Sequence, residues 1–261
     1  MFNKTLVGFF SLLLCLSSFI VNASQLEDIK TSGVIKVAVP QDFPPFGFVS
    51  TDMSLQGYDI DMAEYIAKSM GVRLELVPVT SANRVPYLQT RKVDLIISSL
   101  GKNAERQRAI DFSAAYAPFF LGVFGKEGVD VSSVEGLSGQ VVGVTRGSVE
   151  DIELSKLAGK DVTIRRFEDN NTTISAYVSG QVDLIATGNV IASEIATKFP
   201  KRHPETKFAI KNSPCFIGVR KGQKSLLTEV NSLIQQAYTE GKLNDMSVNW
   251  LKLPLPADLA S

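Results

Sequence analysis

Apolar and polar positions alternate with two different periods along the chain, and the change of period marks its elements. Residues 34–39 are rich in β-branched side chains and predict a strand. Residues 58–70 then place apolar side chains at helical spacing. The pattern continues with a strand at 73–78, a helix that carries Pro86 in its first turn, and a strand at 93–97. This β-α-β-α-β order predicts a parallel sheet with helices on both faces.

A second α/β pattern begins near residue 141. Its strands are expected at residues 141–144, 162–166 and 182–186, each followed by a turn or a helical segment. Two extended apolar runs, 117–124 and 207–219, lie on either side of it. Both halves also contain a Val-Asp-Leu-Ile segment, which is a weak internal repeat. We therefore expect an α/β protein with two similarly built lobes.

Residues 92–116 carry the first candidate for binding chemistry. The strand in this stretch ends in Ser98-Ser99-Leu100-Gly101, and Asn103 is placed to cap a short helix. A strand that ends in small residues before a helix leaves backbone N–H groups free above the carboxyl edge of the sheet, where open α/β sheets bind ligands. Arg106 follows closely and can add a planar two-pronged donor for a carboxylate. The alternative is a solvated helix start with a surface arginine.

The N-terminal residues 1–23 predict a signal peptide. Lys4 supplies a basic start, residues 6–20 are apolar, and Val21-Asn22-Ala23 forms a small-residue cleavage site. Lipidation at Cys15 is the competing interpretation, but the residue before a lipidated cysteine should be small and here it is leucine. No later stretch is long and apolar enough to span a bilayer. The mature protein is therefore expected to be periplasmic and soluble.

Composition argues against several other functions. The 27 basic and 27 acidic residues cancel, so the chain has no basic excess for binding nucleic acid. Outside the predicted signal peptide Cys215 is the only cysteine, which predicts a buried, inert thiol and no intramolecular disulfide. The single histidine, His203, lies in a polar run, and no His/Cys cluster exists. We expect no metal site and no cofactor.

Five motifs together carry a resemblance that covers essentially the whole mature chain. They are Phe43-Pro44-Pro45-Phe46, Gly57-Tyr58-Asp59-Ile60-Asp61, Val85-Pro86-Tyr87-Leu88-Gln89-Thr90, Glu105-Arg106 to Asp111-Phe112-Ser113, and Val144-Thr145-Arg146-Gly147-Ser148. In this combination the chain resembles a periplasmic solute-binding protein of the polar amino-acid ABC-transporter family, bacterial solute-binding protein family 3.

The resemblance implies a two-lobed periplasmic binding protein fold, in which two hinge strands join mostly parallel sheets flanked by helices. Lobe 1 is expected at residues 24–121 and 217–261, and lobe 2 at residues 122–216. The family also implies a monomer that binds an amino acid or a related small carboxylate in the cleft and delivers it to an ABC permease in the inner membrane.

The resemblance further assigns roles to individual residues. An arginine at the position of Arg106 holds the ligand carboxylate, assisted by backbone groups at Ser99 and Gly101 and by Ser148 from the other lobe. Gly101 replaces the usual Ser or Thr, so only its backbone N–H can help. Phe43 matches the aromatic residue that packs on the ligand, although packing of this loop over the sheet is the alternative.

The ligand's ammonium group lacks its expected partner. Gly188 and Pro40 stand where the family commonly has aspartates, and Asn189 follows Gly188 on the lobe 2 side of the cleft. A buried ammonium without a carboxylate partner is costly. Either another acid takes over or the ligand is not an ordinary α-amino acid. Three acids are candidate substitutes, each of which could instead be a solvated surface acid: Asp42, Glu150 and Glu194.

Two other functions compete with solute binding. The family is also similar to secreted cyclohexadienyl dehydratases, whose chemistry needs a desolvated carboxylic acid such as Glu150 or Asp42. A sensory input domain is the third interpretation, and the lack of a membrane span after Leu251 argues against a covalent receptor. We expect a binding protein rather than an enzyme. The loops that set ligand selectivity are those around Phe46, Asn83, Arg84 and residues 168–171.

Overall fold

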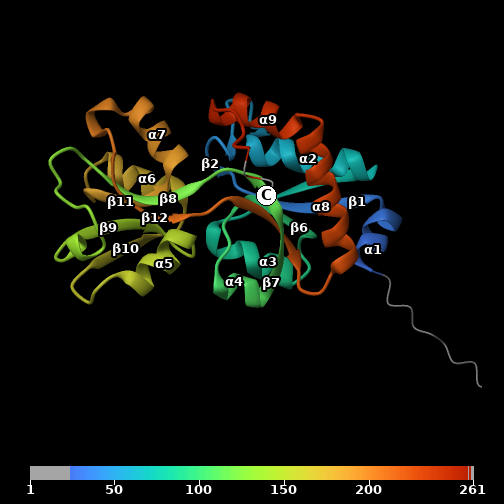
Figure 1. Cartoon of the computed structure of the whole chain (residues 1–261), viewed down its shortest axis with the longest axis horizontal. Helices are drawn as coiled ribbons and strands as arrows, with labels where there is room; N and C mark the ends of the chain where they lie inside the picture. The colour runs from blue at the N-terminus through green and yellow to red at the C-terminus, as the bar shows by residue number, and fades with distance from the viewer. Residues whose placement is uncertain (1–23, 258, 260–261) are drawn as a thin grey trace, which may run out of the picture.

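The computed structural model describes residues 24–257 and 259, and these form two lobes joined by two strands (Figure 1). The first lobe contains both ends of the described chain, and the second is built from its middle part. The predicted signal peptide and the alternative of lipidation at Cys15 lie outside the described residues.

A five-stranded mixed sheet forms the centre of the first lobe. Its strand order is β5 (Arg73–Pro78), β1 (Val34–Val39), β6 (Leu95–Leu100), β13 (Cys215–Arg220) and β7 (Ile110–Ala117). The first three strands are parallel, as the β-α-β-α-β pattern predicts. Strand β13 pairs antiparallel with both β6 and β7. Strand β7 has no counterpart in the sequence prediction, which placed no strand between the helix near Arg106 and residue 117.

Helices cover both faces of this sheet. Along β6, Ile97 packs with the cluster that includes α2, whereas Ile96 packs with the cluster that includes α3. All six β6 residues are buried, which explains why the strand has no polar face. The helices of this lobe are α1 (Gln25–Ser32), α2 (Tyr58–Met70), α3 (Arg84–Gln89), α4 (Ala104–Ala109), α8 (Lys224–Thr239) and α9 (Lys242–Met246).

The second lobe repeats this plan. Its sheet has the order β10 (Thr163–Phe167), β9 (Val141–Thr145), β11 (Leu184–Gly188), β8 (Phe120–Gly125) and β12 (Glu205–Asn212). Strands β10, β9 and β11 are parallel, and each overlaps the strand predicted there. Strand β8 is antiparallel to both β11 and β12. The helices are α5 (Val149–Leu157), α6 (Asn170–Val178) and α7 (Asn189–Lys198).

The chain crosses between the lobes at two adjacent points. It leaves the first sheet after β7 and enters the second at β8, through Pro118-Phe119. It returns between β12 and β13 through Ser213-Pro214, where the Ser213 N–H donates to the Phe119 carbonyl at 3.0 Å. We propose lobe boundaries at these crossings rather than after residues 121 and 216, because β8 and β13 each belong wholly to one sheet.

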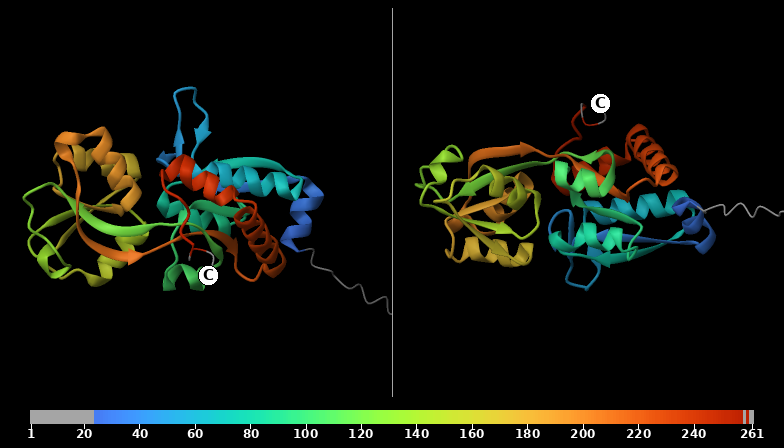
Figure 2. Two further views of the ribbon diagram at one scale, coloured as in Figure 1. Left: turned by 45° about the horizontal axis from the view of Figure 1, so that its top comes forward. Right: turned by 90° about the horizontal axis from the view of Figure 1, so that it is seen from below.

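Two smaller features lie beside the main sheets. A three-stranded antiparallel sheet, β2 (Asp42–Phe43), β3 (Gly47–Val49) and β4 (Leu55–Gln56), projects from the first lobe (Figure 2). After α9, a turn of π-helix at Ser247–Leu251 leads into a C-terminal segment that returns to the crossings (Figure 2). The small sheet matters for function because β2 carries two of the predicted site residues.

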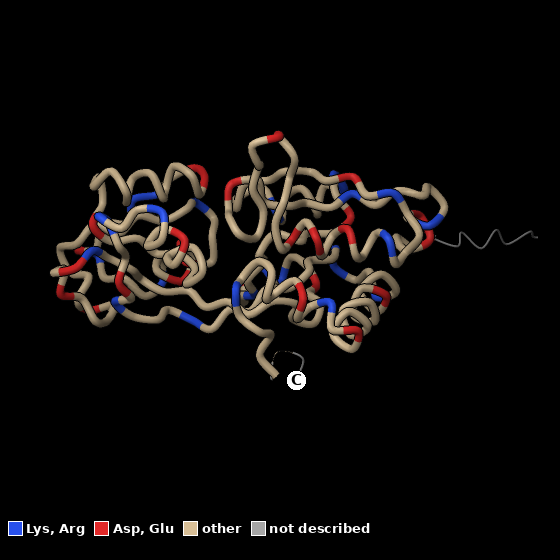
Figure 3. The backbone as a smooth tube through the Cα atoms, turned by 90° about the horizontal axis from the view of Figure 1, so that it is seen from above, with Lys and Arg blue, Asp and Glu red and all other residues tan. Residues whose placement is uncertain are grey.

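Charged residues of both signs are interspersed over both lobes (Figure 3). No helix within residues 24–257 combines the length and the apolar character needed to cross a membrane. In the same part of the chain, His, Cys, Asp and Glu side chains nowhere gather in threes as metal ligands would. Cys215 is a free, fully buried thiol, as predicted.

Candidate ligand-binding cleft

The two lobes close over a small cavity at the carboxyl ends of their parallel strands. The first lobe lines it with Phe43, Ser81, Arg84, Ser99 and Gly101, and the second with Ser148, Val149, Glu150 and Asn170. Phe119 and Ser213 add walls from the two crossings. The cavity measures about 20 Å³, enough for about one water molecule. A larger ligand therefore enters only when the lobes separate.

The buried carboxylate of Asp59 stabilises the turn at the end of β6. Asn103 Oδ1 accepts from the Arg106 N–H at 2.8 Å, which confirms the predicted helix cap. Ser99 has a positive φ of 39°, and its N–H donates to Asp59 Oδ2 at 2.7 Å. The second Asp59 oxygen accepts from the Tyr116 hydroxyl. The structure thus places Ser99 at the cavity but directs its backbone N–H to Asp59.

Arg106 is buried, and its guanidinium links the two lobes. Nη1 donates to the Gly101 carbonyl at 3.0 Å, and Nη2 donates to the Gly147 carbonyl of the second lobe at 2.9 Å. Burial, followed by repulsion from Arg84, lowers the pKa of Arg106 to about 10, so the side chain stays charged at neutral pH. Arg106 lies beside the cavity rather than in its lining.

Gly101 allows the second lobe to approach this turn closely. A Cβ atom there would lie 2.6 Å from Ser213 Oγ and 2.9 Å from Val149 Cγ2. A Ser or Thr at position 101 would therefore require the Ser213 and Val149 side chains to shift. This contact gives a steric reason for the departure from the family pattern.

Arg84 is a second buried arginine, and it lines the cavity directly. Only 5% of the residue is exposed, and its Nε donates to no group among the described residues. Burial lowers the pKa of the guanidinium, and the nearby charges of Asp59, Glu150 and Asp42 oppose that shift. Sequence analysis placed Arg84 only in a selectivity loop, because nothing in the local pattern distinguishes a buried arginine from a surface one.

Glu150 also lines the cavity, from the first turn of α5. The surface alternative considered for this residue is wrong, since only 7% of it is exposed. Burial raises the pKa of the Glu150 carboxyl, against the opposing effects of its own N–H, Arg84 and Ser148. Glu194 is placed elsewhere, where it pairs with Lys198 at 3.0 Å on α7.

Asp42 is buried as well, but both of its oxygens contact the second lobe. Oδ2 accepts from the Asn170 N–H at 2.7 Å, and Oδ1 accepts from Asn170 Nδ2 at 3.0 Å. Asn170 begins α6, so Asp42 stabilises the positive end of a helix in the opposite lobe. Its carboxylate therefore ties the lobes together at the margin of the cleft.

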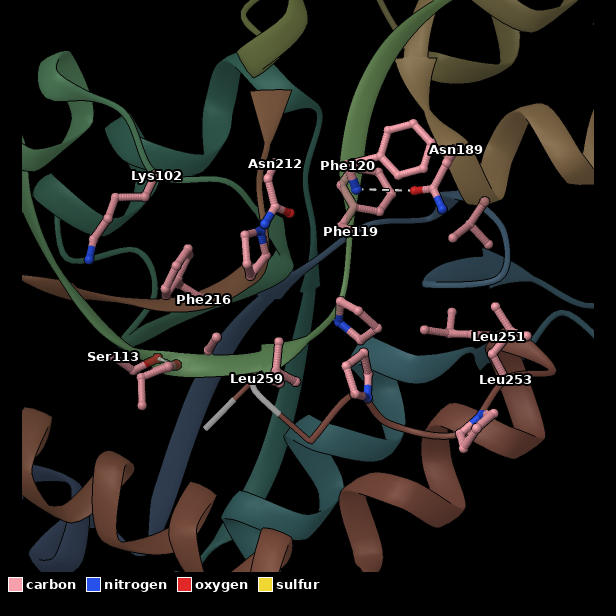
Figure 4. Close-up of a pocket in the computed structure, with 17 residues that line it drawn as sticks. Lys102, Ser113, Phe119, Phe120, Asn189, Asn212, Phe216, Leu251, Leu253 and Leu259 are labelled. Carbon is pink, nitrogen blue, oxygen red and sulfur yellow. Dashed lines mark hydrogen bonds between the residues drawn. The ribbon is translucent and has the colours of Figure 1, made fainter. Parts of the chain in front are cut away.

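The predicted residues Gly188 and Asn189 do not join the cavity lining. Gly188 packs under the Phe119 ring, where a Cβ atom would lie 1.8 Å from Cζ. Asn189 Oδ1 accepts from the Phe120 N–H at 3.1 Å and borders a separate groove of about 690 Å³ between the crossings and the C-terminal segment (Figure 4). The aspartate that the family often has at position 188 would collide with Phe119 as that ring stands.

Aromatic rings form one wall of the site. Phe43 lines the cavity and lies 6.1 Å from Phe46, centroid to centroid, and Phe46 is fully buried in the core. The Phe119 ring meets Phe46 edge-on at 5.3 Å. Sequence analysis interpreted residues 117–124 only as an extended run, and the role of Phe119 depends on a contact with β11 that is remote along the chain.

Comparison with known proteins agrees with this architecture. Residues 35–253 match the family of bacterial extracellular solute-binding proteins, family 3. The L-cystine-binding protein TcyJ of Escherichia coli K12 is 27% identical over 86% of this chain and 85% of its own length. The glutamine-binding protein GlnH of Bacillus subtilis, an ABC transporter protein, is 29% identical over 87% and 84%. A cyclohexadienyl dehydratase of Pseudomonas aeruginosa is 25% identical over 94% and 92%.

A solved structure shares the fold. A mutant arginine-binding protein from T. maritima superposes with a TM-score of 0.81 and 28% sequence identity, covering 87% of this chain and 99% of that one. With two lobes, two crossings and a family match over most of its length, the chain belongs to the bacterial extracellular solute-binding proteins of family 3.

Proposed function

We propose that this protein is the ligand-binding component of an ABC importer and holds an amino acid or a related small carboxylate between its lobes. The observation that carries the proposal is the cavity itself, where Arg84 of one lobe and Glu150 of the other are buried together. Buried charges of this kind are costly unless a partner compensates them. A zwitterionic or anionic ligand supplies that compensation, and the relatives that bind amino acids favour this class.

Transport follows from lobe closure. In the closed form, Arg106 reaches the Gly147 carbonyl and Asp42 reaches Asn170, so both bonds form only when the lobes meet. A ligand that contacts both lobes binds the closed form better than the open form and shifts the population toward it. We infer that a periplasmic monomer presents this closed form to a permease in the inner membrane.

Calorimetry after a thermal-shift screen tests the proposal. A tight ligand raises the unfolding temperature by mass action. Amino acids and small carboxylates, each supplied at millimolar concentration, are expected to include at least one that raises it and binds one site per chain. If no compound of either class binds to the purified full-length mature protein, the proposed function is wrong.

Glu150 favours one alternative, a cyclohexadienyl dehydratase-like enzyme. A buried carboxyl with a raised pKa can act as a general acid, and one relative is such a dehydratase. Incubation with prephenate or arogenate, followed by ultraviolet absorbance, separates the two functions. We expect no aromatic product. Product that forms with the wild type but not with Glu150→Gln would establish the enzyme instead.

A further inference from the structure

The two crossings have different surroundings on their two faces. On the returning crossing, Ser213 lines the ligand cavity, whereas its neighbours Asn212 and Pro214 line the separate groove of about 690 Å³. On the outgoing crossing, Pro118 lines only the groove, and Phe119 borders both spaces. Successive side chains of an extended chain point to opposite faces. The groove therefore lies behind the hinge, on the face opposite to the ligand cavity.

Each lobe supplies one wall of this groove. The wall of the first lobe is the C-terminal segment, residues 252–257 and 259, which contributes Leu253 and Leu259. The wall of the second lobe contains Phe120 of β8 and Val190 at the start of α7. Figure 4 shows side chains of both walls around the same space. In the right-hand view of Figure 2, the C-terminal end and the small sheet lie on opposite sides of the crossings.

The C-terminal segment is fixed to the first lobe. The buried Ser247 hydroxyl donates to the Leu253 carbonyl at 2.8 Å, and the Leu255 N–H donates to Asn244 Oδ1 at 3.1 Å. Leu255 also packs against the larger apolar core, and a proline on each side of it restricts the backbone. The segment therefore moves with the first lobe when the lobes rotate.

Leu253 is unusually exposed for a large apolar side chain. In the closed form 63% of it faces solvent, at the edge of the groove. Rotation of the lobes about the crossings widens one face of the hinge and narrows the other. Opening of the ligand cavity therefore brings the wall of the second lobe toward the C-terminal segment. Covering Leu253 with Phe120 and Val190 removes apolar surface from water, which is favourable.

We propose that the C-terminal segment stabilises the open, ligand-free form by burying Leu253 against the Phe120 and Val190 wall as the groove closes. This inference rests on the proposed function only in that the lobes must open, and it does not depend on which ligand binds. A contact made only in the open form lowers the population of the closed form. Ligand affinity is then set partly by apolar residues on the far side of the hinge from the ligand.

Distances between two spin labels in the ligand-free mature protein test the proposal. Met53→Cys on the small sheet and Asn171→Cys on α6 replace exposed residues on opposite sides of the cleft mouth, and the buried Cys215 thiol stays unlabelled. The protein is unfolded and refolded first, which removes any bound ligand. Leu253→Ser is the test variant. Leu157→Ser is the matched control, since this leucine is 53% exposed at the end of α5 and does not line the groove.

We expect a short-distance closed population and a long-distance open population in the wild type. Leu253→Ser should shift their ratio about threefold to tenfold toward the closed form, because part of a leucine side chain is no longer buried on opening. Leu157→Ser should leave the ratio unchanged. Leu253→Met keeps the apolar surface and should resemble the wild type.

The opposite wall provides a second variant. Val190→Ser should shift the ratio in the same direction, and adding it to Leu253→Ser should have little further effect, because both remove one contact. An unchanged or more open distribution in Leu253→Ser overturns the proposal, as does a wild type without an open population. No ligand enters this measurement, so the proposed function is still decided by the binding screen alone.

Discussion

At the scale of single residues, buried charges shape the cleft more than the exposed loops do. Asp59 is fully buried in the first turn of α2, and it fixes the Ser99 turn through one hydrogen bond and Tyr116 through another. Tyr116 lies on β7, two residues before the outgoing crossing begins. One carboxylate therefore connects the floor of the site to the strand that leads into the hinge.

Asp59 should make the stability of the protein depend on pH. Burial raises the pKa of its carboxyl from 3.8 to about 7, so between these values the folded state holds a proton that the unfolded state has lost. Stability conferred by this proton is complete below about pH 4 and is lost as pH rises through about 7, on the order of 4 kcal/mol in all. Urea denaturation at several pH values should show wild type losing stability relative to Asp59→Asn across that window. Parallel pH profiles would contradict the assignment.

Arg106 is expected to contribute strongly to ligand affinity. Arg106→Ala removes the proposed carboxylate donor together with its bond to the Gly147 carbonyl, and should weaken binding about a hundredfold, ~2–3 kcal/mol. Calorimetry with the ligand from the screen measures the change. Arg108→Ala, on the same helix but exposed, should leave the dissociation constant unchanged. An unchanged constant in Arg106→Ala itself would rule out this role.

At the scale of elements, helix caps and close contacts between a backbone and a side chain position the site. Ser148 Oγ accepts from the Asp151 N–H at 3.1 Å and caps α5. The Asp151 carboxylate accepts from the Gly147 N–H at 3.0 Å, so hydrogen bonds stabilise both ends of the turn before α5. This rigid turn presents the Gly147 carbonyl to Arg106. The Ser148 hydroxyl thus supports the helix whose start faces the cavity.

The contact of β11 with the outgoing crossing gives a prediction about packing. Gly188→Ala places a Cβ atom 1.8 Å from Phe119 Cζ and should destabilise the protein by ~1–3 kcal/mol. Gly136→Ala is the matched control, because its nearest contact would be an ordinary 3.6 Å. Urea denaturation should also show that Phe119→Ala relieves the effect of Gly188→Ala. Full stability of the single Gly188→Ala variant would show that Phe119 is free to move aside.

At the scale of the whole molecule, two hydrogen-bonded contacts between the lobes stabilise the closed form. One joins Arg106 to the Gly147 carbonyl, and the other joins Asp42 to Asn170. Neither Arg106 nor Asp42 lines the cavity in this closed form, so both contacts can change the balance between the open and closed forms. Ligand affinity then depends in part on Asp42, which acts through lobe closure rather than through the cavity.

Asp42 offers the cleanest test of this coupling. Asp42→Ala removes both bonds to Asn170 and should weaken ligand binding about tenfold, ~1.4 kcal/mol, by making closure less favourable. A double-mutant cycle with Asn170→Ala should show that the two losses are not additive. Small-angle scattering should find the Asp42→Ala variant more open at a given ligand concentration. Additive effects in the cycle would mean that the bond from the Asn170 side chain does not contribute to closure, and unchanged binding by Asp42→Ala would contradict the coupling itself.

Local pattern was enough to predict most elements, because helical and strand periods depend on neighbouring residues. It placed the parallel strands of both sheets, α2, α3 and the cap at Asn103. It missed β7, because this strand pairs with β13, which is about 100 positions away along the chain. It also missed β2, β3 and β4, because each has only two or three residues. The family motifs then predicted which sheet edges face the ligand.

Local pattern and family motifs were enough to predict the α/β class, the two-lobed plan and some of the residues that line the cavity, among them Phe43, Ser99 and Ser148. The packed structure was needed to show which donor and acceptor groups pair with one another. The Ser99 N–H belongs to Asp59, 40 positions away, and the Asp42 carboxylate belongs to Asn170, 128 positions away. The same long-range arrangement buries Arg84 Nε with no hydrogen-bond partner among the residues that the structure describes. Burial and hydrogen-bond satisfaction are properties of the packed chain, and no local pattern encodes them.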